Sequence, residues 1–143
     1  MKAVLIGSGN IAHQAGAALV KNGHTVLQVF GRNPVTTKSL ARKMKCAAVY
    51  SPADLTAKAD VYLLAVPDRE IAEAAARIPF SDKIVAHTSG SVPLDAIPKR
   101  FMHAGVFYPL QTITSGKNVK WKDVPICIES RTIIGEKRLN KIG

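Results

Sequence analysis

Acidic residues are missing from the first 53 positions of this 143-residue sequence. No Asp or Glu precedes Asp54, although residues 1–50 contain seven Lys and Arg side chains, and the whole chain has a net charge of +10. A segment whose charged residues are all basic has a positive electrostatic potential and should attract phosphorylated ligands. A solvated basic helix surface is the alternative explanation, which a phosphate-binding motif nearby would disfavour.

Cysteines, aromatic residues and long apolar runs are also scarce. Cys46 and Cys127 are the two cysteines, too few for a disulfide framework or a metal-ligand cluster, so we expect reduced thiols and no metal site. Aromatic residues make up 6% of the chain and are not interleaved with the basic ones, which disfavours nucleic acid as a partner. No run approaches the roughly 20 apolar residues of a membrane helix. We therefore expect no membrane partner and a cytoplasmic location.

Strands and helices are expected to alternate along the chain. Short apolar runs predict strands at 2–6, 25–30, 47–50, 61–66, 84–86, 102–107 and 124–128. Helical spacing of apolar residues predicts helices at 11–21, 37–45 and 71–78, with short helical turns after Ser51 and at 94–97. Buried strands separated by helices imply an α/β fold with a mostly parallel, doubly wound sheet and helices on both faces. Residues 131–143 have a weak pattern and high charge, so we expect a frayed helix or disorder there.

A glycine-rich turn follows the first predicted strand. Gly7, Ser8, Gly9, Asn10, Ile11 and Ala12 fit the pattern G-x-G-x-x-A at the start of the first helix. Gly7 would permit the tight turn, Gly9 would let the backbone approach a pyrophosphate, and the small Ala12 would let the helix pack close to the sheet. The free N–H groups of the helix would then meet the phosphates. An ordinary strand-to-helix turn with two glycines is the structural alternative.

The end of the second strand predicts which dinucleotide would bind. An NAD site usually has Asp or Glu there, whereas this sequence has Arg32 and Asn33. Arg32 can pair with a 2′-phosphate through two hydrogen bonds, and Lys38, Arg42 or Lys43 would add positive charge. We therefore predict NADP as the cofactor. The alternative, that Arg32 is only a surface arginine, would leave the ribose without its usual partner.

Five segments of the sequence resemble, in order, a family of Rossmann-like NADP-binding oxidoreductases. The segments are Ile6 to Ala12, Gly31 to Asn33, Ala65-Val66-Pro67-Asp68, His87-Thr88-Ser89-Gly90-Ser91 and Tyr108-Pro109-Leu110-Gln111-Thr112. The family belongs to the group that contains pyrroline-5-carboxylate reductase, 6-phosphogluconate dehydrogenase and the coenzyme F420-dependent NADP reductases. The resemblance covers residues 2–130 and implies a Rossmann domain followed by a helical domain that dimerises and closes the substrate cleft.

The resemblance also divides the chain. We expect residues 1–130 to form the NADP-binding domain and residues 131–143 to be a tail that begins a C-terminal helical domain, most of which the chain lacks. The chain would then be a piece of a larger enzyme or a nucleotide-binding domain alone. An isolated domain of this kind could expose an apolar patch and self-associate, so a homodimer is one expectation.

The candidate residues for chemistry come from three loops. Ala65, Val66 and Pro67 would line the approach of the nicotinamide. Thr88 and Ser89 would offer hydroxyl groups to a substrate, and Tyr108 and Gln111 form a second polar cluster. The second and third of these loops could equally be structural turns. His87 and His103 can donate protons, but their apolar surroundings favour buried, hydrogen-bonded side chains instead.

The sequence therefore predicts the NADP-binding domain of an oxidoreductase that transfers hydride to or from a small carbonyl or imine substrate. Whether this chain is itself an enzyme stays open. The alternative is a non-catalytic NADP-binding module that lacks the substrate and dimerisation domain.

Overall fold

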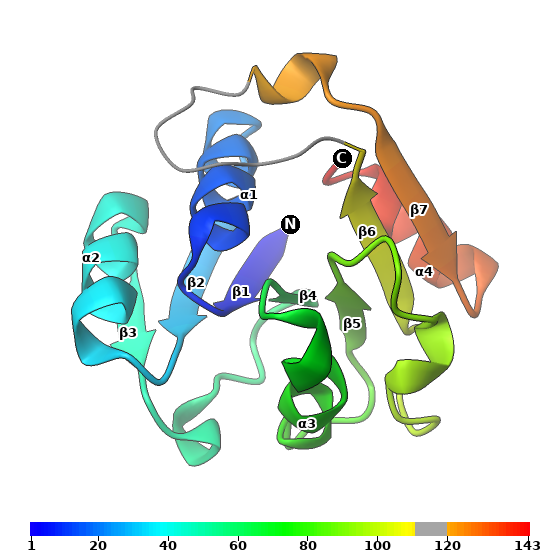
Figure 1. Ribbon diagram of the computed structural model, residues 1–143, viewed down its shortest axis with the longest axis horizontal. Helices are drawn as coiled ribbons and strands as arrows, with labels where there is room; N and C mark the ends of the chain where they lie inside the picture. The colour runs from blue at the N-terminus through cyan, green and yellow to red at the C-terminus, as the bar shows by residue number, and fades with distance from the viewer. Residues whose placement is uncertain (111–119) are drawn as a thin grey trace.

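Short runs of apolar and β-branched residues form a sheet in the part of the chain that the structure describes, residues 1–110 and 120–143 of the computed structural model. Its seven strands lie in the order β3-β2-β1-β4-β5-β6-β7, as Figure 1 shows from left to right. The strands are β1 Lys2–Ile6, β2 Thr25–Phe30, β3 Ala47–Val49, β4 Val61–Leu64, β5 Ile84–His87, β6 Gly105–Pro109 and β7 Ile126–Ser130.

The sheet is parallel from β3 to β6, and β7 runs antiparallel to β6 along the edge. The chain order reverses beside β1, because β2 and β4 pair with opposite sides of that strand. This arrangement confirms the predicted doubly wound Rossmann-type fold, in which ligands bind beyond the carboxyl ends of the strands. The predicted strand at 102–107 starts too early, because residues 101–104 form a turn closed by the Ala104 N–H donating to the Phe101 carbonyl.

Within residues 1–110 and 120–143, four α-helices pack against the sheet: α1 Asn10–Lys21, α2 Pro34–Met44, α3 Ile71–Ala76 and α4 Ile133–Asn140. Short 3-10 turns lie at Pro52–Asp54, Asp68–Glu70, Leu94–Ala96 and Trp121–Asp123. The helix predicted at 37–45 begins three residues earlier. The Asn33 side chain accepts hydrogen bonds from the N–H groups of Val35 and Thr36, at 2.9 and 3.3 Å, and so caps the first turn at Pro34.

Two apolar cores lie on opposite faces of the sheet, because side chains alternate along each strand. Leu5, Leu63 and Ala86 face a core shared with α1, α2 and α4. Ile6 and Leu64 face a second core shared with α3 and the loop segments around Leu55 and Phe101. Strands buried on both faces explain why their sequences are continuously apolar rather than alternating.

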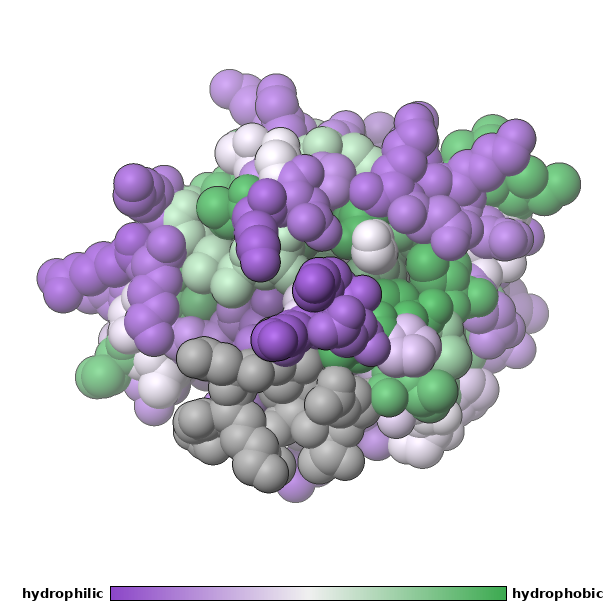
Figure 2. Space-filling model, turned by 90° about the horizontal axis from the view of Figure 1, so that it is seen from above, coloured by the Kyte–Doolittle hydropathy of each residue, from purple (hydrophilic) through white to green (hydrophobic). Residues whose placement is uncertain are grey.

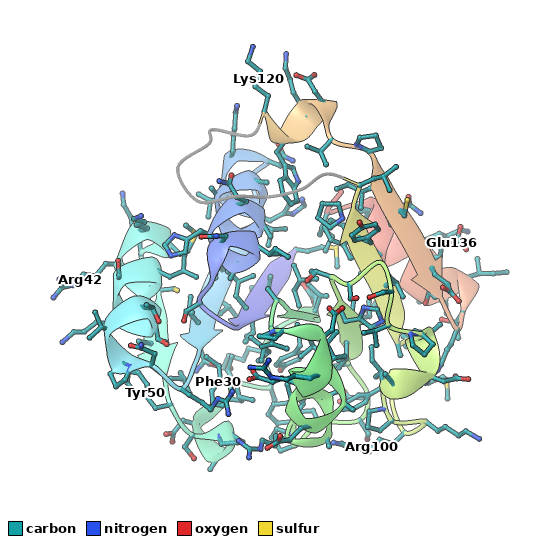
Figure 3. The ribbon with its side chains drawn as sticks, viewed as in Figure 1. Phe30, Arg42, Tyr50, Arg100, Lys120 and Glu136 are labelled. Atoms are coloured by element: carbon teal, nitrogen blue, oxygen red, sulfur yellow. The ribbon has the colours of Figure 1, made fainter. Side chains whose placement is uncertain are left out.

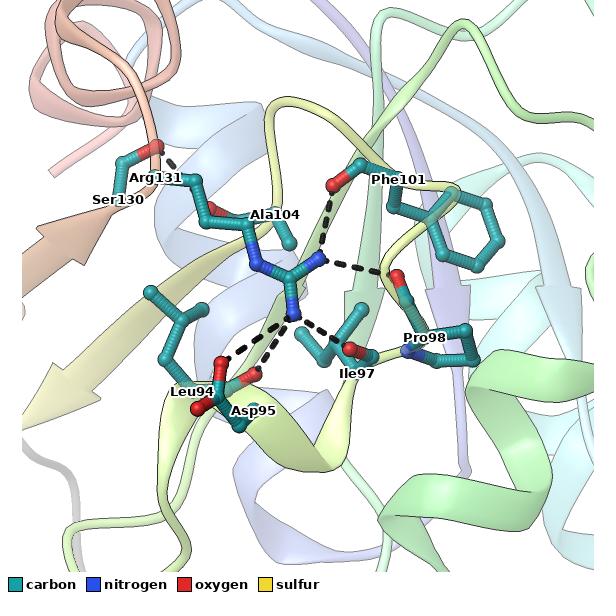
Figure 4. A network of polar contacts seen from close by, with 8 residues as sticks. All are labelled: Leu94, Asp95, Ile97, Pro98, Phe101, Ala104, Ser130 and Arg131. Atoms are coloured by element: carbon teal, nitrogen blue, oxygen red, sulfur yellow. Dashed lines mark hydrogen bonds and ion pairs between the residues drawn. The ribbon is translucent and has the colours of Figure 1, made fainter.

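The C-terminal segment is anchored to the rest of the fold by Arg131. Its guanidinium donates hydrogen bonds to the carbonyl groups of Leu94, Ile97, Pro98 and Phe101, at 2.6 to 3.5 Å (Figure 4). Beyond this anchor, α4 packs against β6 and β7, with Leu139 and Ile142 buried. The expectation of a frayed or disordered tail is therefore wrong, because weak sequence periodicity is compensated by a partly buried cation and by two buried apolar side chains.

Seen from above in Figure 2, hydrophilic side chains cover much of the surface, and smaller apolar areas lie between them. Among the described residues, no helix is both long enough and apolar enough to span a membrane.

Candidate functional site

The glycine turn lies where β1 passes into α1. Gly7 has a φ of +113°, a conformation that residues with a side chain rarely adopt, and a Cβ atom there would collide with the Ala65 carbonyl oxygen. Its N–H donates to the Phe30 carbonyl at 2.7 Å, which ties the turn to the end of β2. The turn therefore lies against the ends of β2 and β4, in a tight conformation that a glycine at position 7 permits.

Gly9 differs from Gly7 because nothing in the described fold requires a glycine there. Its backbone is extended, at φ −84° and ψ −168°, and no atom lies within 4 Å of a Cβ built on it. Gly9 precedes α1, whose first turn has no side-chain cap and no acidic residue. The N–H groups of this turn are therefore free for an anion, and a bare backbone at Gly9 leaves room for it.

A cleft of about 330 Å³ opens beside this turn. Eight of the ten predicted cofactor residues line it: Gly7, Ser8, Gly9, Arg32, Asn33, Ala65, Val66 and Pro67. Asn10 and Ile11 lie on the first turn of α1 and do not line the cleft. The structure thus brings together three loops that are separated in the sequence, because each follows a strand that ends at the same edge of the sheet.

Hydroxyl groups gather at the β2 end of the cleft. The Ser8 and Thr36 oxygens are 2.8 Å apart and link the glycine turn to the first turn of α2. The Thr37 hydroxyl is buried, has no hydrogen-bond partner among the described residues, and lies against Gly31, where a Cβ would collide with it. Of these residues, Ser8 lines the cleft together with Arg32, so a hydroxyl group and a guanidinium are both available to a phosphate there.

Additional positive charge from α2 is not directed into the cleft. Lys38, Arg42 and Lys43 are absent from its lining, and the last two lie at the end of α2 opposite to Asn33. Figure 3 shows Arg42 projecting outward from α2, whereas Phe30 lies at the end of β2 and lines the cleft. Arg42 and Lys43 therefore lie away from the cleft, and a contribution of Lys38, Arg42 or Lys43 to phosphate binding stays a prediction.

The far wall of the cleft was not predicted from the sequence. It comes from the segment after β4 and contains Glu70, Glu73, Ala74 and Arg77. Glu70 pairs with Arg32 across the cleft at 2.5 Å, and Glu73 pairs with Arg77 within α3 at 2.5 Å. The helical spacing of apolar residues predicts this helix, but it cannot show which part of the sheet the polar face of the helix approaches.

A second hollow, of about 260 Å³, lies at the β5, β6 and β7 end of the sheet. It brings together the predicted residues Ser89 and Tyr108, and adds Cys127 and Glu129 from β7. The Tyr108 ring packs against Gly90, where a Cβ would lie 2.5 Å from the ring. Gln111, the other member of that predicted cluster, lies outside the described residues.

The loop after β5 is held by its own hydrogen bonds. The Thr88 hydroxyl donates to the Leu64 carbonyl at 3.1 Å, and the Ser89 hydroxyl accepts from the N–H groups of Ser91 and Val92, both at 3.2 Å. The Ser91 hydroxyl donates to Asp68 at 2.8 Å, which joins this loop to the segment after Pro67. The loop is therefore a well-formed turn, and its residues Ser89 and Gly90 line the second hollow.

Buried, hydrogen-bonded side chains are expected for His87 and His103, and the structure agrees in part, because Nε2 of His87 is buried without a hydrogen-bond partner among the described residues. His87 is fully buried and accepts a hydrogen bond from the Ser89 N–H at Nδ1. Burial lowers its pKa, and the Pro93 carbonyl, Asp68 and Glu129 oppose this effect in part. His103 is half-buried, with Nδ1 at 2.6 Å from the Thr132 hydroxyl.

The cleft fits a dinucleotide phosphate on three independent observations. The N-terminus of α1 is uncapped, a side chain at Gly9 would project into open space, and Arg32 lines the same cleft as Ser8 and Gly9. The turn would hold the pyrophosphate through backbone N–H groups, and Arg32 would hold a 2′-phosphate. The donors present thus match NADP at both of its phosphate positions.

Comparison with known proteins agrees with this geometry. Among solved structures, the chain is 30% identical to a Bacteroides fragilis protein described as an NADP oxidoreductase, with a TM-score of 0.89 over 99% of this chain and 55% of that one. Synechocystis arogenate dehydrogenase (16% identity, TM-score 0.83, 99% and 55% covered) shares the fold. So does pyrroline-5-carboxylate reductase from Streptococcus pyogenes (14%, 0.77, 99% and 53%).

The chain spans little more than half the length of these solved structures. No match was found among proteins with curated descriptions. Residues 2–89, which contain the glycine turn, Arg32 and the Ala65 to Pro67 loop, match the family described as NADP oxidoreductase, coenzyme F420-dependent. The chain therefore belongs to this family of NADP oxidoreductases, and NADP is its cofactor.

Proposed function

We propose that this chain is the NADP-holding part of an oxidoreductase that acts on a small carbonyl or imine compound. The observation that carries the proposal is the cleft, which is lined both by the glycine turn that precedes the uncapped α1 and by Arg32. Bound NADP would supply or accept the hydride. The chain's own residues would bind the two phosphate positions and orient the dinucleotide along the strand ends.

The second hollow is the place where we propose that the substrate binds. An extended dinucleotide whose adenine end lies at β2 would direct its other end past Ala65 to Pro67, toward the loop after β5. Ser89 and Tyr108 meet in the hollow beyond that loop. We propose that the Tyr108 hydroxyl orients the substrate, because the Ser89 hydroxyl already accepts two backbone hydrogen bonds. A Tyr108→Phe variant should then lower turnover and leave NADPH affinity unchanged.

A non-catalytic NADP-binding module is the second candidate. The observation that favours it is the hydrogen bonding of the loop after β5. The hydroxyl groups of both Thr88 and Ser89 already form hydrogen bonds with backbone groups. This candidate predicts NADPH binding without hydride transfer to any carbonyl or imine compound.

Calorimetric titration with NADPH and NADH tests the cofactor assignment. NADPH should bind at least about tenfold more tightly, a difference of about 1.4 kcal/mol, and Arg32→Ala should remove this preference. Arg138→Ala is the matched control, because it removes an exposed arginine from α4, at the opposite edge of the sheet. An equal loss of preference in both variants would show that net charge, rather than a site, attracts NADPH.

A further inference from the structure

The Arg32 guanidinium has a carboxylate partner that its own neighbourhood in the sequence does not provide. Its Nη2 atom lies 2.5 Å from Oε1 of Glu70, a residue 38 positions further along the chain. Arg32 follows β2, whereas Glu70 ends the 3-10 turn between β4 and α3. Both side chains line the cleft.

This ion pair is too exposed to serve mainly as a stabilising contact. The Arg32 side chain is 66% exposed and the Glu70 side chain 25%. Exposed pairs of this kind are screened by water and salt and contribute little to stability. Its placement inside the cleft therefore matters more for what binds there than for folding.

The ion pair also affects which form of the adenosine ribose the cleft should favour, the 2′-hydroxyl or the 2′-phosphate. A carboxylate at that end accepts hydrogen bonds from ribose hydroxyls and is typical of NAD sites, whereas an arginine is typical of NADP sites. The sequence has no acidic residue before Asp54, but the fold brings Glu70 to the same guanidinium. The cleft therefore contains both elements, one from each side.

We infer that Glu70 is a specificity-determining residue that limits the preference of the cleft for 2′-phosphorylated nucleotides. Its carboxylate occupies one N–H edge of Arg32 and opposes a phosphate dianion that approaches the remaining donors. A ligand with a free 2′-hydroxyl meets no such opposition. The inference rests on the proposed function, since it requires that the cleft binds a nucleotide with its ribose beside Arg32.

The size of the effect follows from charge separation at a hydrated site. A carboxylate and a phosphate dianion that share one guanidinium lie roughly 6 Å apart, where solvent and salt reduce their repulsion but do not remove it. Removing the Glu70 charge should therefore tighten binding of a 2′-phosphorylated ligand by about three- to tenfold. Glutamine keeps the length of the side chain and can still accept a hydrogen bond from Arg32.

The test compares adenosine 2′,5′-bisphosphate with adenosine 5′-monophosphate, which differ only in the 2′-phosphate. Both are titrated by calorimetry into the wild-type chain and the Glu70→Gln variant. Glu73→Gln is the matched control, because it removes the same charge from the same cleft but breaks a pair with Arg77 instead. Thermal unfolding of each variant verifies that it is folded.

The ratio of the two Kd values is the readout. Glu70→Gln should raise the preference for the bisphosphate by about three- to tenfold, and Glu73→Gln should change it by less than about twofold. An unchanged or reduced preference in folded Glu70→Gln, with both ligands still bound, would overturn the inference and leave the proposed function standing. Failure of both nucleotides to bind any variant would overturn the proposed function, and the inference with it.

Discussion

A methyl group added at Gly7 should lower stability, whereas one added at Gly9 should lower affinity for NADPH, although the two residues lie in the same turn. At Gly7 the methyl group would meet the Ala65 carbonyl oxygen, and the φ of +113° would be strained for any residue with a side chain. Strained backbone of this kind costs about 1–3 kcal/mol, and the collision adds to it. We expect Gly7→Ala to lower the free energy of unfolding by about 3 kcal/mol and Tm by roughly 10 °C.

At Gly9 the same methyl group meets no atom of the described fold within 4 Å, and the backbone is already extended. Stability should be unchanged or raised by about 0.5 kcal/mol, because alanine restricts the unfolded chain. The methyl group would instead occupy the space through which a pyrophosphate approaches the backbone N–H groups. Losing one charge-assisted hydrogen bond of about 1.5–3 kcal/mol predicts about ten- to hundredfold weaker NADPH binding.

Thermal unfolding and calorimetric titration of both variants test this contrast. Gly7→Ala should lose stability, whereas Gly9→Ala should keep its stability and lose affinity for NADPH. A Gly9→Ala variant that binds NADPH as tightly as the wild-type chain would refute the reasoning, because the open space at Gly9 would then have no ligand to accommodate.

Three further changes test the fold around the site. Arg131→Ala should lower the free energy of unfolding by about 3 kcal/mol in urea titrations, because it leaves several loop carbonyls without their charged donor; a loss below about 1 kcal/mol would contradict the anchoring role. Burial lowers the pKa of His87 from 6.5, so below that pH the unfolded chain takes up a proton that the folded chain does not. Stability should therefore fall as the pH drops from about 6.5 toward 5, with a smaller slope in His87→Asn; an equal slope in both would reject this assignment. Burial and the nearby Asp82 raise the pKa of Tyr62 to about 12, and its hydroxyl donates to the Thr56 carbonyl. Tyr62→Phe should cost about 1 kcal/mol in the same titrations, and a gain in stability would argue against that hydrogen bond.

The Rossmann-type fold and most of the predicted residues that line the cleft could be identified from the sequence because both depend on local signals. Gly7 and Gly9 come just after an apolar strand, and Arg32 comes just after the next strand, where folds of this type usually contact the ribose. Helix ends were less predictable. The start of α2 at Pro34 depends on the Asn33 side chain accepting two backbone N–H groups, which periodicity does not reveal.

Contacts between distant segments account for what the sequence did not reveal. Nothing in the spacing of Glu70 indicates that its carboxylate reaches Arg32, because the pairing depends on how the turn after β4 lies beside β2. The order in the C-terminal segment likewise depends on Arg131 meeting carbonyl groups of a loop more than 30 residues earlier. The spacing of apolar residues cannot reveal such an anchor, because the anchor is a single arginine side chain and not a repeating pattern.

Hydrogen–deuterium exchange with and without NADPH tests most directly that the cleft beside the glycine turn is the cofactor site. The account predicts slower amide exchange at residues 7–12 and 31–37, where the turn and the start of α2 meet the phosphates. It predicts little change in β7 and α4, at the other edge of the sheet. Protection confined to β7 and α4, or no protection at the glycine turn under saturating NADPH, would contradict it.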